Sequence, residues 1–462
     1  MAAFTIDEIA KVTKAQIFQR GKESFVTGIS IDTRTIQPKE LFIALIGENF
    51  DGHNFVSQAI IKGAQAVIIS DAAYAEKINT DITVLLVKDT RKSLEDIAHF
   101  HRMRFNIPVI GVTGSNGKTT TKDMITAVLK NRFRVTSTQK NFNNEIGLSL
   151  TLLSITEHTE VCVVEMGMRG LGQIKELCDI ASPTIGVVTN VGTSHIGILG
   201  SQDRIAEAKK ELIDALPDSG IAVLNGDDIR VNKMGDTFSG RIIHYGINQR
   251  YTVRATDIKY ESECTRYICT CFDEAFKVRL NLLGIHNVYD SLAATAACRA
   301  LGVDISKIQK ALDDFRSADQ RQSIQDIQGI TILDDSYNAN PLSMEMAFSS
   351  LKQIKGKRYF LVLGDMGELG EFENDLHYKT GMKAAEYGFD GLVTVGSLSK
   401  HIARGASGGI KLIQSCNNCE EAADILLKLL KPGDVVLVKG SHYMHMEKIP
   451  AILRGVLDKH GK

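Results

Sequence analysis

One stretch constrains the fold of this chain more than any other: VIGVTGSNGKTTTKDM, at residues 109–124. An apolar run leads into a glycine-rich turn, and apolar residues recur at helical spacing beyond it. A strand, a glycine loop and a helix N-terminus form a cradle in which backbone N–H groups and the helix dipole attract phosphate. Lys118 adds a full positive charge, and Thr119 adds a hydroxyl that suits Mg²⁺. The stretch therefore predicts a phosphate-binding loop.

The loop is a tighter variant of the general Walker A pattern. That pattern places a glycine five residues before Gly117, where this chain has Val112. An ordinary glycine-rich turn between strand and helix is the alternative, but adjacent Lys-Thr-Thr at the helix start argues against it. We expect an ATP site formed by Gly114, Ser115, Asn116, Gly117, Lys118, Thr119 and Thr120.

Length and charge exclude several classes of protein. A chain of 462 residues is long enough for two to four domains. Lys and Arg total 54 against 55 Asp and Glu, so no overall basic field favours nucleic acid as a partner. An anionic ligand must instead be held by a local site.

Secretion and membrane insertion are not expected. No apolar run reaches the ~18 residues of a membrane span, and the N-terminal segment carries Asp7 and Glu8, unlike a signal peptide. The eight cysteines are scattered, and the lone CxxC at Cys416 and Cys419 has no second pair to complete a zinc site. Free thiols in a cytoplasmic protein are the expectation.

Hydrophobic patterning predicts an α/β chain of three domains. Residues 1–106 should form a small mixed α/β domain, with strands at 41–46 and 66–69 and a helix at 55–62. A loop between the first strand and the helix is crowded with polar side chains, which turn chemistry alone can explain.

Residues 107–314 should form a central domain around the phosphate-binding loop. Short apolar runs at 161–166, 184–190 and 221–225 alternate with helical patterns, which indicates a mostly parallel sheet. Residues 250–283 are rich in Tyr, Thr and Val, which is typical of antiparallel strands.

Residues 315–462 should form a Rossmann-like, doubly wound domain. Strand and helix patterns alternate from Ile330 onward. The first strand of this domain lacks a following GxGxxG, so no dinucleotide is assigned to it.

Three polar residues follow strands of the predicted central sheet. Glu165 ends VCVVE, Asn190 ends TIGVVTN, and His195 follows in VGTSHIG. Ligands of such sheets lie beyond the carboxyl ends of the strands. Each residue alone is more often a turn former, but three at one edge beside a phosphate loop favour metal and phosphate chemistry.

Several motifs resemble those of the Mur ligases, the ATP-dependent amide ligases of peptidoglycan assembly. TGSNGKTT is similar to the family's ATP motif, and the more specific matches are KNFNNEIGLSLTLL, EMGMRGLGQI, NVGTSHIGILGS, GIHNVYDSLAA, DDSYNANPLSM, LGDMGELGE and VKGSHYMHME. The resemblance implies ATP-dependent joining of D-alanyl-D-alanine to UDP-N-acetylmuramoyl-tripeptide through an acyl phosphate. It also implies that the first domain binds the UDP-sugar end and that the third domain binds the dipeptide. A monomer suffices for this chemistry and is the expectation, although the sequence does not fix the oligomeric state.

The resemblance implies a role for each catalytic candidate. Lys118 would hold the β- and γ-phosphates, Thr119 and Glu165 would hold one Mg²⁺, and His195 would belong to a second metal site. Lys209, with Lys210 as the fallback, matches a lysine that the family carbamylates. Such a lysine must have a lowered pKa, because only the neutral amine captures CO₂. Without the family, a solvated Lys-Lys pair would be the simpler interpretation.

Further residues are implied to bind nucleotide or substrate. Asn287 resembles an adenine contact, and Arg321 and Asp335 resemble residues that close over ATP. The candidates for substrate binding are Thr33, Arg34, Asn49, His53, Asn141, Asn143, Asn144, Tyr337, Asn338 and Asn340. Polar turns and helix caps explain many of these residues equally well. Two residues depart from the family pattern, Lys140 and Arg169. Their positive charges are expected to affect how the protein binds the carboxylates of the peptide.

Three other functions are compatible with parts of this sequence. A folylpolyglutamate synthetase would share the ATP site and differ in its acceptor. A GTPase switch or regulatory ATPase is a second alternative. A GTPase should have the guanine-binding motif Asn-Lys-x-Asp, but Asn232-Lys233 continues with Met-Gly. A non-catalytic binding protein is the third alternative. Against it argues the joint presence of Lys118, Thr119, Glu165, His195 and Lys209.

Overall fold

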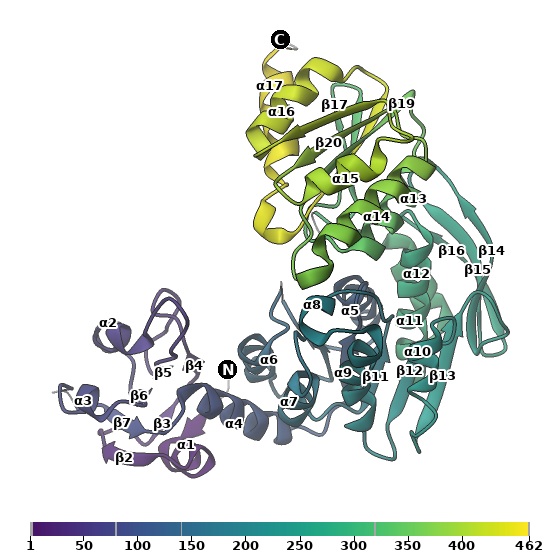
Figure 1. Ribbon diagram of the computed structural model, residues 1–462. Coiled ribbons are helices and arrows are strands. Elements are labelled where there is room, and N and C mark those ends of the chain that lie inside the picture. Colours follow the sequence, from purple (N-terminus) through teal and green to yellow (C-terminus); the bar gives the residue numbers. More distant parts are fainter. Residues whose placement is uncertain (1–2, 79–80, 140, 318–319, 461–462) are drawn as a thin grey trace.

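The computed structural model describes residues 3–78, 81–139, 141–317 and 320–460. Three larger sheets follow one another along the chain, within residues 16–86, 109–280 and 323–439. In Figure 1 the first part (purple) lies to one side of the central part (blue to teal), and the C-terminal part (green to yellow) lies above it. This is the expected α/β architecture of three domains. The boundaries at 106/107 and 314/315 stay a prediction.

The N-terminal domain is built on a five-stranded sheet of order β2-β7-β6-β5-β4, parallel except at β2. The predicted strand at 66–69 is present, whereas the one predicted at 41–46 ends at Ile43, because the backbone turns back and Gly52 N bonds to Leu45 O. The predicted helix at 55–62 is a 3₁₀ turn followed by an α-helix. The elements are β1 Phe4–Thr5, α1 Ile6–Thr13, β2 Gln16–Gln19, β3 Phe25–Val26, β4 Ile29–Ser30, β5 Leu41–Ile43, η1 Gly52–Phe55, α2 Val56–Ile61, β6 Ala66–Ile69, α3 Ala72–Ala75, β7 Thr83–Leu86 and α4 Thr90–Met103.

The central domain has a nine-stranded sheet of order β16-β15-β14-β13-β12-β11-β8-β10-β9. It is parallel from β9 to β14 and antiparallel over β14, β15 and β16, as the pattern of residues 250–283 predicts. The elements are β8 Val109–Thr113, α5 Lys118–Leu129, β9 Val135–Ser137, α6 Glu145–Leu153, β10 Val161–Glu165, α7 Gln173–Ala181, β11 Ile185–Val188, α8 Ile196–Leu199, α9 Gln202–Asp214, β12 Ile221–Asn225, α10 Ile229–Lys233, β13 Arg241–Gly246, β14 Val253–Tyr260, β15 Thr265–Cys271, β16 Glu274–Leu280, α11 Ile285–Ala300 and α12 Ile305–Asp314.

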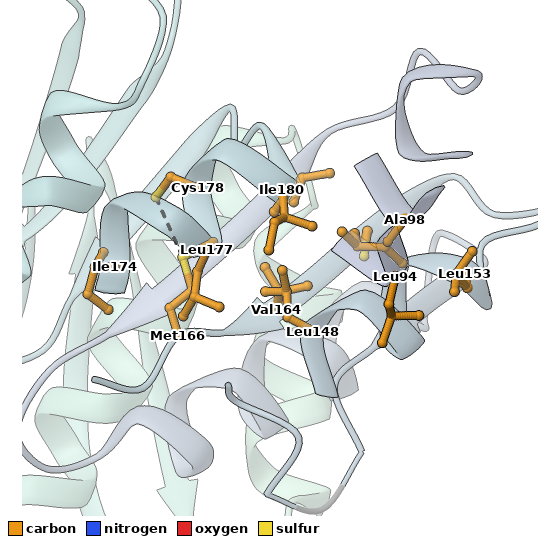
Figure 2. Close-up of a cluster of buried hydrophobic side chains, with 14 of the residues drawn as sticks. Leu94, Ala98, Leu148, Leu153, Val164, Met166, Ile174, Leu177, Cys178 and Ile180 are labelled. Carbon is orange, nitrogen blue, oxygen red and sulfur yellow. Dashed lines mark hydrogen bonds between the residues drawn. The ribbon is translucent and has the colours of Figure 1, made fainter. Parts of the chain in front are cut away.

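Apolar side chains bury both faces of this sheet. On one face α5, α11 and α12 pack together, and the small residues of α11 let it approach α5 closely. On the other face α6 and α7 meet α4, which brings Leu94 and Ala98 into the cluster shown in Figure 2. Helix α4 therefore anchors the N-terminal domain to the central domain through a continuous apolar core.

The C-terminal domain is a six-stranded sheet of order β17-β18-β22-β19-β20-β21, parallel except for the edge strand β17. Helices α13, α14 and α15 cover one face, and α16 and α17 cover the other. The elements are β17 Ser323–Ile327, β18 Ile330–Asp334, α13 Pro341–Gln353, β19 Arg358–Gly364, η2 Gly370–Phe372, α14 Glu373–Glu386, β20 Gly391–Val395, α15 Ser399–Ala406, β21 Leu412–Cys416, α16 Cys419–Leu429, β22 Asp434–Lys439, η3 His442–Met444 and α17 Lys448–His460.

Two further observations concern the chain as a whole. None of the helices in the described part of the chain has the length and apolar character that crossing a membrane requires. All eight cysteines are free thiols, and all are buried.

Candidate active site

The phosphate-binding loop connects β8 to α5 at the carboxyl end of the central sheet. Strands β10 and β11 flank β8 in parallel, so the residues that follow all three strands meet at one edge. Gly114 and Gly117 have φ angles of +152° and +80°. A Cβ at Gly114 would lie 1.8 Å from Thr189 Oγ1, and one at Gly117 would lie 2.2 Å from Asp290 Oδ1. Both positions therefore require glycine, for conformation and for space.

The segment after β11 holds the loop in shape. Ser115 N donates to Asn190 O and Asn116 N donates to Asn190 Oδ1, each over 2.9 Å. Thr189 Oγ1 donates to Asn116 O over 2.6 Å. Asn190, which the sequence placed at a strand end beside the phosphates, thus acts as an anchor for the loop backbone.

Thr119 and Glu165 lie side by side next to Lys118. Thr119 Oγ1 donates to Glu165 Oε2 over 2.7 Å, and Asn143 Nδ2 donates to Glu165 Oε1 over 2.8 Å. Lys118 Nζ donates to Gly114 O over 2.8 Å. Burial lowers the pKa of the Lys118 ammonium, while the nearby Glu165 carboxylate acts to raise it.

Lys209 lies on α9, with a side chain buried beside the same site. The residue is 2% exposed, and within the described residues no hydrogen bond or ion pair involves its Nζ. Burial, and then the charge of Lys118, lower the pKa of Lys209 well below its usual value. Its neighbour Lys210 pairs with Asp214 instead. Lys209 rather than Lys210 therefore has the environment that a reactive neutral amine requires.

His195 meets a carboxylate from the C-terminal domain. Its Nδ1 lies 2.5 Å from Glu368 Oε2, and Arg169 Nε lies 3.1 Å from Glu368 Oε1. The contact with His195, supported by the charge of Arg169, holds the pKa of Glu368 below its usual value against the effect of burial. Arg169, which departs from the family pattern, thus points to Glu368.

The nucleotide-binding candidates lie where the central domain meets the C-terminal domain. Asn287 is buried, and its Nδ2 donates to Leu283 O over 2.7 Å and to Gln322 Oε1 over 3.2 Å. The Arg321 guanidinium lies 3.7 Å from the centre of the Tyr337 ring. Contacts within the protein therefore hold both the Asn287 amide and the Arg321 guanidinium in place.

Asp335 is paired with a lysine that the sequence did not single out. Lys439 Nζ lies 2.5 Å from Asp335 Oδ2 and donates to Asn338 O over 2.9 Å. Burial raises the pKa of Asp335, and Lys439 opposes that rise. Lys439 ends the buried strand β22, beside β18, from which Asp335 follows.

Asn340 joins the C-terminal domain to the phosphate-binding loop. It caps α13 by accepting a 2.9 Å hydrogen bond from Ser343 N. Its Nδ2 donates to Asn116 Oδ1 over 2.7 Å and to Ser194 Oγ over 2.8 Å. The helix-cap interpretation of this asparagine is confirmed, and its role in binding substrate stays a prediction.

The N-terminal candidates lie in their own domain and are not brought to the phosphate loop. Thr33 Oγ1 donates to Gln58 Oε1, and Arg34 pairs with Asp32 of the same turn. His53 is buried, with Nδ1 2.6 Å from Asp51 Oδ1 and Nε2 accepting from Ser70 N over 3.0 Å. Both ring nitrogens of His53 are thus engaged inside the domain. A role for these residues in binding substrate stays a prediction, as it does for the exposed Asn49.

The segment before α6 also separates into two roles. Asn143 reaches Glu165, whereas Asn144 caps α6 by accepting from Gly147 N over 3.0 Å. Asn141 is exposed. Lys140 lies outside the described residues.

Asp290 was missed by sequence reasoning. It is buried under the phosphate loop and accepts a 3.2 Å hydrogen bond from Thr121 Oγ1. Burial raises its pKa to about 8. The available signal was a carboxylate inside the otherwise small and apolar DSLAATAA segment of α11.

The oxygen atoms at the phosphate loop determine whether the site fits a divalent cation. Within the described residues, no three His, Cys, Asp or Glu side chains are grouped so as to hold a metal ion. Thr119 Oγ1 and Glu165 Oε2 nevertheless offer two oxygens 2.7 Å apart at the phosphate loop. Mg²⁺ is commonly bound by one or two protein oxygens together with substrate phosphates, so these residues fit that cation.

The fold and the site define a three-domain P-loop enzyme that binds a nucleoside triphosphate. Residues 25–102 match the description "Mur ligase family, catalytic domain", residues 112–298 match the Mur ligase middle domain, and residues 321–442 match "Mur ligase, glutamate ligase domain". The chain belongs to the Mur ligase family.

Individual relatives agree over the full length. The UDP-N-acetylmuramoyl-tripeptide--D-alanyl-D-alanine ligase of Bacillus subtilis (strain 168) is 36% identical over 453 residues, which cover 96% of this chain and 97% of that protein. A crystal structure of MurF from Acinetobacter baumannii covers 98% of this chain and 99% of that one, with a TM-score of 0.92 and 30% identity. MurF from Thermotoga maritima in complex with ADP covers 94% and 99%, with a TM-score of 0.85 and 29% identity.

Proposed function

We propose that this chain is an ATP-dependent ligase that joins D-alanyl-D-alanine to UDP-N-acetylmuramoyl-tripeptide. The observation that carries the proposal is the meeting of Lys118, Thr119, Glu165 and Lys209 at one edge of the central sheet. The printed names of the full-length relatives support the choice of substrates. The product would be UDP-N-acetylmuramoyl-pentapeptide, with ADP and phosphate, for peptidoglycan synthesis.

The reaction has two steps. The terminal carboxylate of the tripeptide attacks the γ-phosphorus of ATP, giving an acyl phosphate and ADP. The amine of D-alanyl-D-alanine then attacks the activated carbonyl carbon, phosphate leaves, and the amine loses a proton. Both steps bring anions together, so positive charge must offset their repulsion. Lys118 supplies such charge at the β- and γ-phosphates.

A Mg²⁺ ion would be held by Thr119 and Glu165, and a second cation would lie near His195. The ions would neutralise charge on the phosphate oxygens. Lys209 fits a carbamylated lysine because its amine is buried and its pKa is lowered. A carbamate there would be an oxygen ligand for the second cation, facing the positive charge of Lys118.

The remaining binding residues are assigned by position. Asn287 would contact adenine, Arg321 would close over the phosphates, and Asp335 would meet the ribose. Lys439 would keep the Asp335 carboxylate in place, since it contacts it at 2.5 Å. The substrate groups would meet the other polar candidates: Thr33, Arg34, Asn49 and His53 at the UDP-sugar end, and Asn141, Asn143, Asn144, Tyr337, Asn338 and Asn340 in the cleft.

The proposal extends to the cellular location and the oligomeric state of the protein. The eight free cysteines suit a reducing compartment, so we place the reaction in the cytoplasm. A monomer suffices, because all groups assigned to the chemistry come from one chain. The N-terminal domain would bind the nucleotide-sugar and the C-terminal domain would bind the dipeptide.

A panel of acceptors tests the proposal. Phosphate release is measured with Mg²⁺, ATP and UDP-N-acetylmuramoyl-tripeptide, with D-alanyl-D-alanine, D-alanine or glutamate added in turn. A parallel series replaces the tripeptide by a folate. Release should require both the tripeptide and D-alanyl-D-alanine. Release driven by a folate and glutamate would favour a folylpolyglutamate synthetase instead, and release without any acceptor would favour a regulatory ATPase.

A further inference from the structure

Glu368 lies where the C-terminal domain touches the central domain beside His195. Its two carboxylate oxygens are divided between two side chains of the central domain, with Oε2 2.5 Å from His195 Nδ1 and Oε1 3.1 Å from Arg169 Nε. Arg169 comes from the loop after β10, and His195 comes from the loop after β11. The carboxylate therefore ties two loops of the active-site edge to a third loop from another domain.

The backbone at this contact is shaped for close approach. Glu368 and His195 have φ angles of +61° and +64°, a region that residues with a Cβ rarely adopt. Such conformations persist where the surrounding structure holds them, and they cluster at functional sites. Gly197 N donates to Glu368 O over 3.3 Å, and a Cβ at Gly197 would lie 2.4 Å from Gly370 N.

Apolar contact reinforces the docking of these loops. Ile196 packs against the core of the central domain and also against the core that α13 and α14 form in the C-terminal domain. The short helix α8 and the η2 turn lie against each other. The His195 segment is thus held from the C-terminal side by packing, by a backbone hydrogen bond and by the Glu368 carboxylate.

We propose that Glu368 is a positioning residue that orients the His195 ring when the C-terminal domain is closed on the central domain. A carboxylate 2.5 Å from one imidazole nitrogen restrains the ring and leaves the other nitrogen, Nε2, available to the second cation assigned to this residue. Arg169 holds the carboxylate at the correct place. The role in catalysis rests on the proposed ligase function, whereas the cross-domain contact does not.

This arrangement links closure of the C-terminal domain on the central domain to the orientation of the His195 ring. When the domains are apart, Glu368 no longer reaches His195, and the ring is free to turn. When they close, the ring is oriented at the same time as water is excluded from an acyl phosphate that water would hydrolyse. Loss of the Glu368 charge should therefore lower kcat more than it changes the KM for ATP.

The test compares Glu368→Gln with the matched control Glu371→Gln, an exposed glutamate in the adjacent η2 turn. Kinetics of ligation, melting temperature, and amide hydrogen exchange of residues 193–200 with ADP bound are measured on the full-length proteins. We expect kcat of Glu368→Gln to fall roughly tenfold or more, with the KM for ATP changing by less than about threefold. Exchange of residues 193–200 should become faster, and Arg169→Gln should show the same changes to a smaller degree.

Three results would overturn the proposal. Glu368→Gln could match Glu371→Gln in both kcat and exchange, or both variants could lose activity equally. A fall in melting temperature with a parallel rise in KM would indicate a merely structural contact. If the wild-type protein does not ligate, the proposed function fails, while the exchange rates still decide whether Glu368 holds the His195 segment.

Discussion

Thr119 Oγ1 donates a 2.7 Å hydrogen bond to Glu165 Oε2, joining the first turn of α5 to the last residue of β10. The pairing follows from the sheet, because β8 and β10 are parallel neighbours and both run toward the phosphate loop. A hydroxyl and a carboxylate so placed form a ligand pair for a hard cation beside bound phosphates.

Removing the Thr119 hydroxyl tests that pairing. Thr119→Val keeps the shape and loses the oxygen, so we expect kcat/KM for ATP to fall by about 10²–10³, in the range seen when one charge-stabilising group is lost. Thr119→Ser retains a hydroxyl and should recover most of the activity. Mg²⁺ titrations of phosphate release are the measurement, and equal activity of the Val and Ser variants would contradict the assignment.

Lys209 is expected to act through a carbamate. Lys209→Ala should lose most ligase activity, and short-chain carboxylic acids should restore part of it by placing a carboxylate in the vacated space. Lys210→Ala is the control, because Lys210 pairs with Asp214 on the same helix. Unchanged activity of Lys209→Ala would exclude the role, and absence of rescue would remove the case for a carbamate.

Alanine variants at two glycines of nearly equal φ distinguish the effect of backbone strain from the effect of a steric clash. Gly117 at +80° and Gly172 at +83° both begin helices, but a Cβ at Gly117 would lie 2.2 Å from Asp290 Oδ1, whereas a Cβ at Gly172 would have nothing within 4 Å. Each alanine variant should lose ~1 kcal/mol of stability from its backbone conformation. Only Gly117→Ala should also weaken ATP binding, by roughly tenfold or more, since it displaces the loop. Calorimetric titration with ATP measures the difference, and equal affinities would contradict it.

Asp290 should make stability depend on pH. Burial raises its pKa from 3.8 to about 8. The folded protein therefore holds this proton more tightly than the unfolded chain does. The bound proton contributes fully to the free energy of unfolding below about pH 4, and this contribution is lost as the pH rises to about 8. Asp290→Asn keeps a neutral side chain of the same shape.

The variant should therefore gain stability relative to wild type between about pH 5 and pH 8, by on the order of a few kcal/mol. Urea unfolding at a series of pH values gives the free energies of unfolding. The exposed Asp424 supplies the control, Asp424→Asn. A difference between Asp290→Asn and wild type that does not vary with pH would contradict the prediction.

The sequence allowed the core of the site to be predicted because that part is local. Gly114 to Thr120 lie in one continuous stretch, and Glu165 ends a strand with a clear apolar run. Parallel strands bring their carboxyl ends to one edge, so the nearness of Thr119 and Glu165 could be expected without coordinates.

The rest depends on which distant segments pack together. Two of the remaining residues, Glu368 and Lys439, come from separate segments of the C-terminal domain, and Asp290 comes from α11. The residues next to them in the sequence do not indicate which side chains they contact. The edge strand β17 has the polar sequence SIQDI, and it is a strand because it pairs with β18. His53 looked like a polar loop residue, but Asp51 and Ser70 draw its ring inward.

The most direct test follows an oxygen atom through the reaction. UDP-N-acetylmuramoyl-tripeptide labelled with ¹⁸O in its terminal carboxylate is incubated with the wild-type protein, Mg²⁺, ATP and D-alanyl-D-alanine, and the products are analysed by mass spectrometry. The account predicts a pentapeptide product and released phosphate that carries one ¹⁸O from the carboxylate. Phosphate without the label, or phosphate released with no pentapeptide formed, would contradict it.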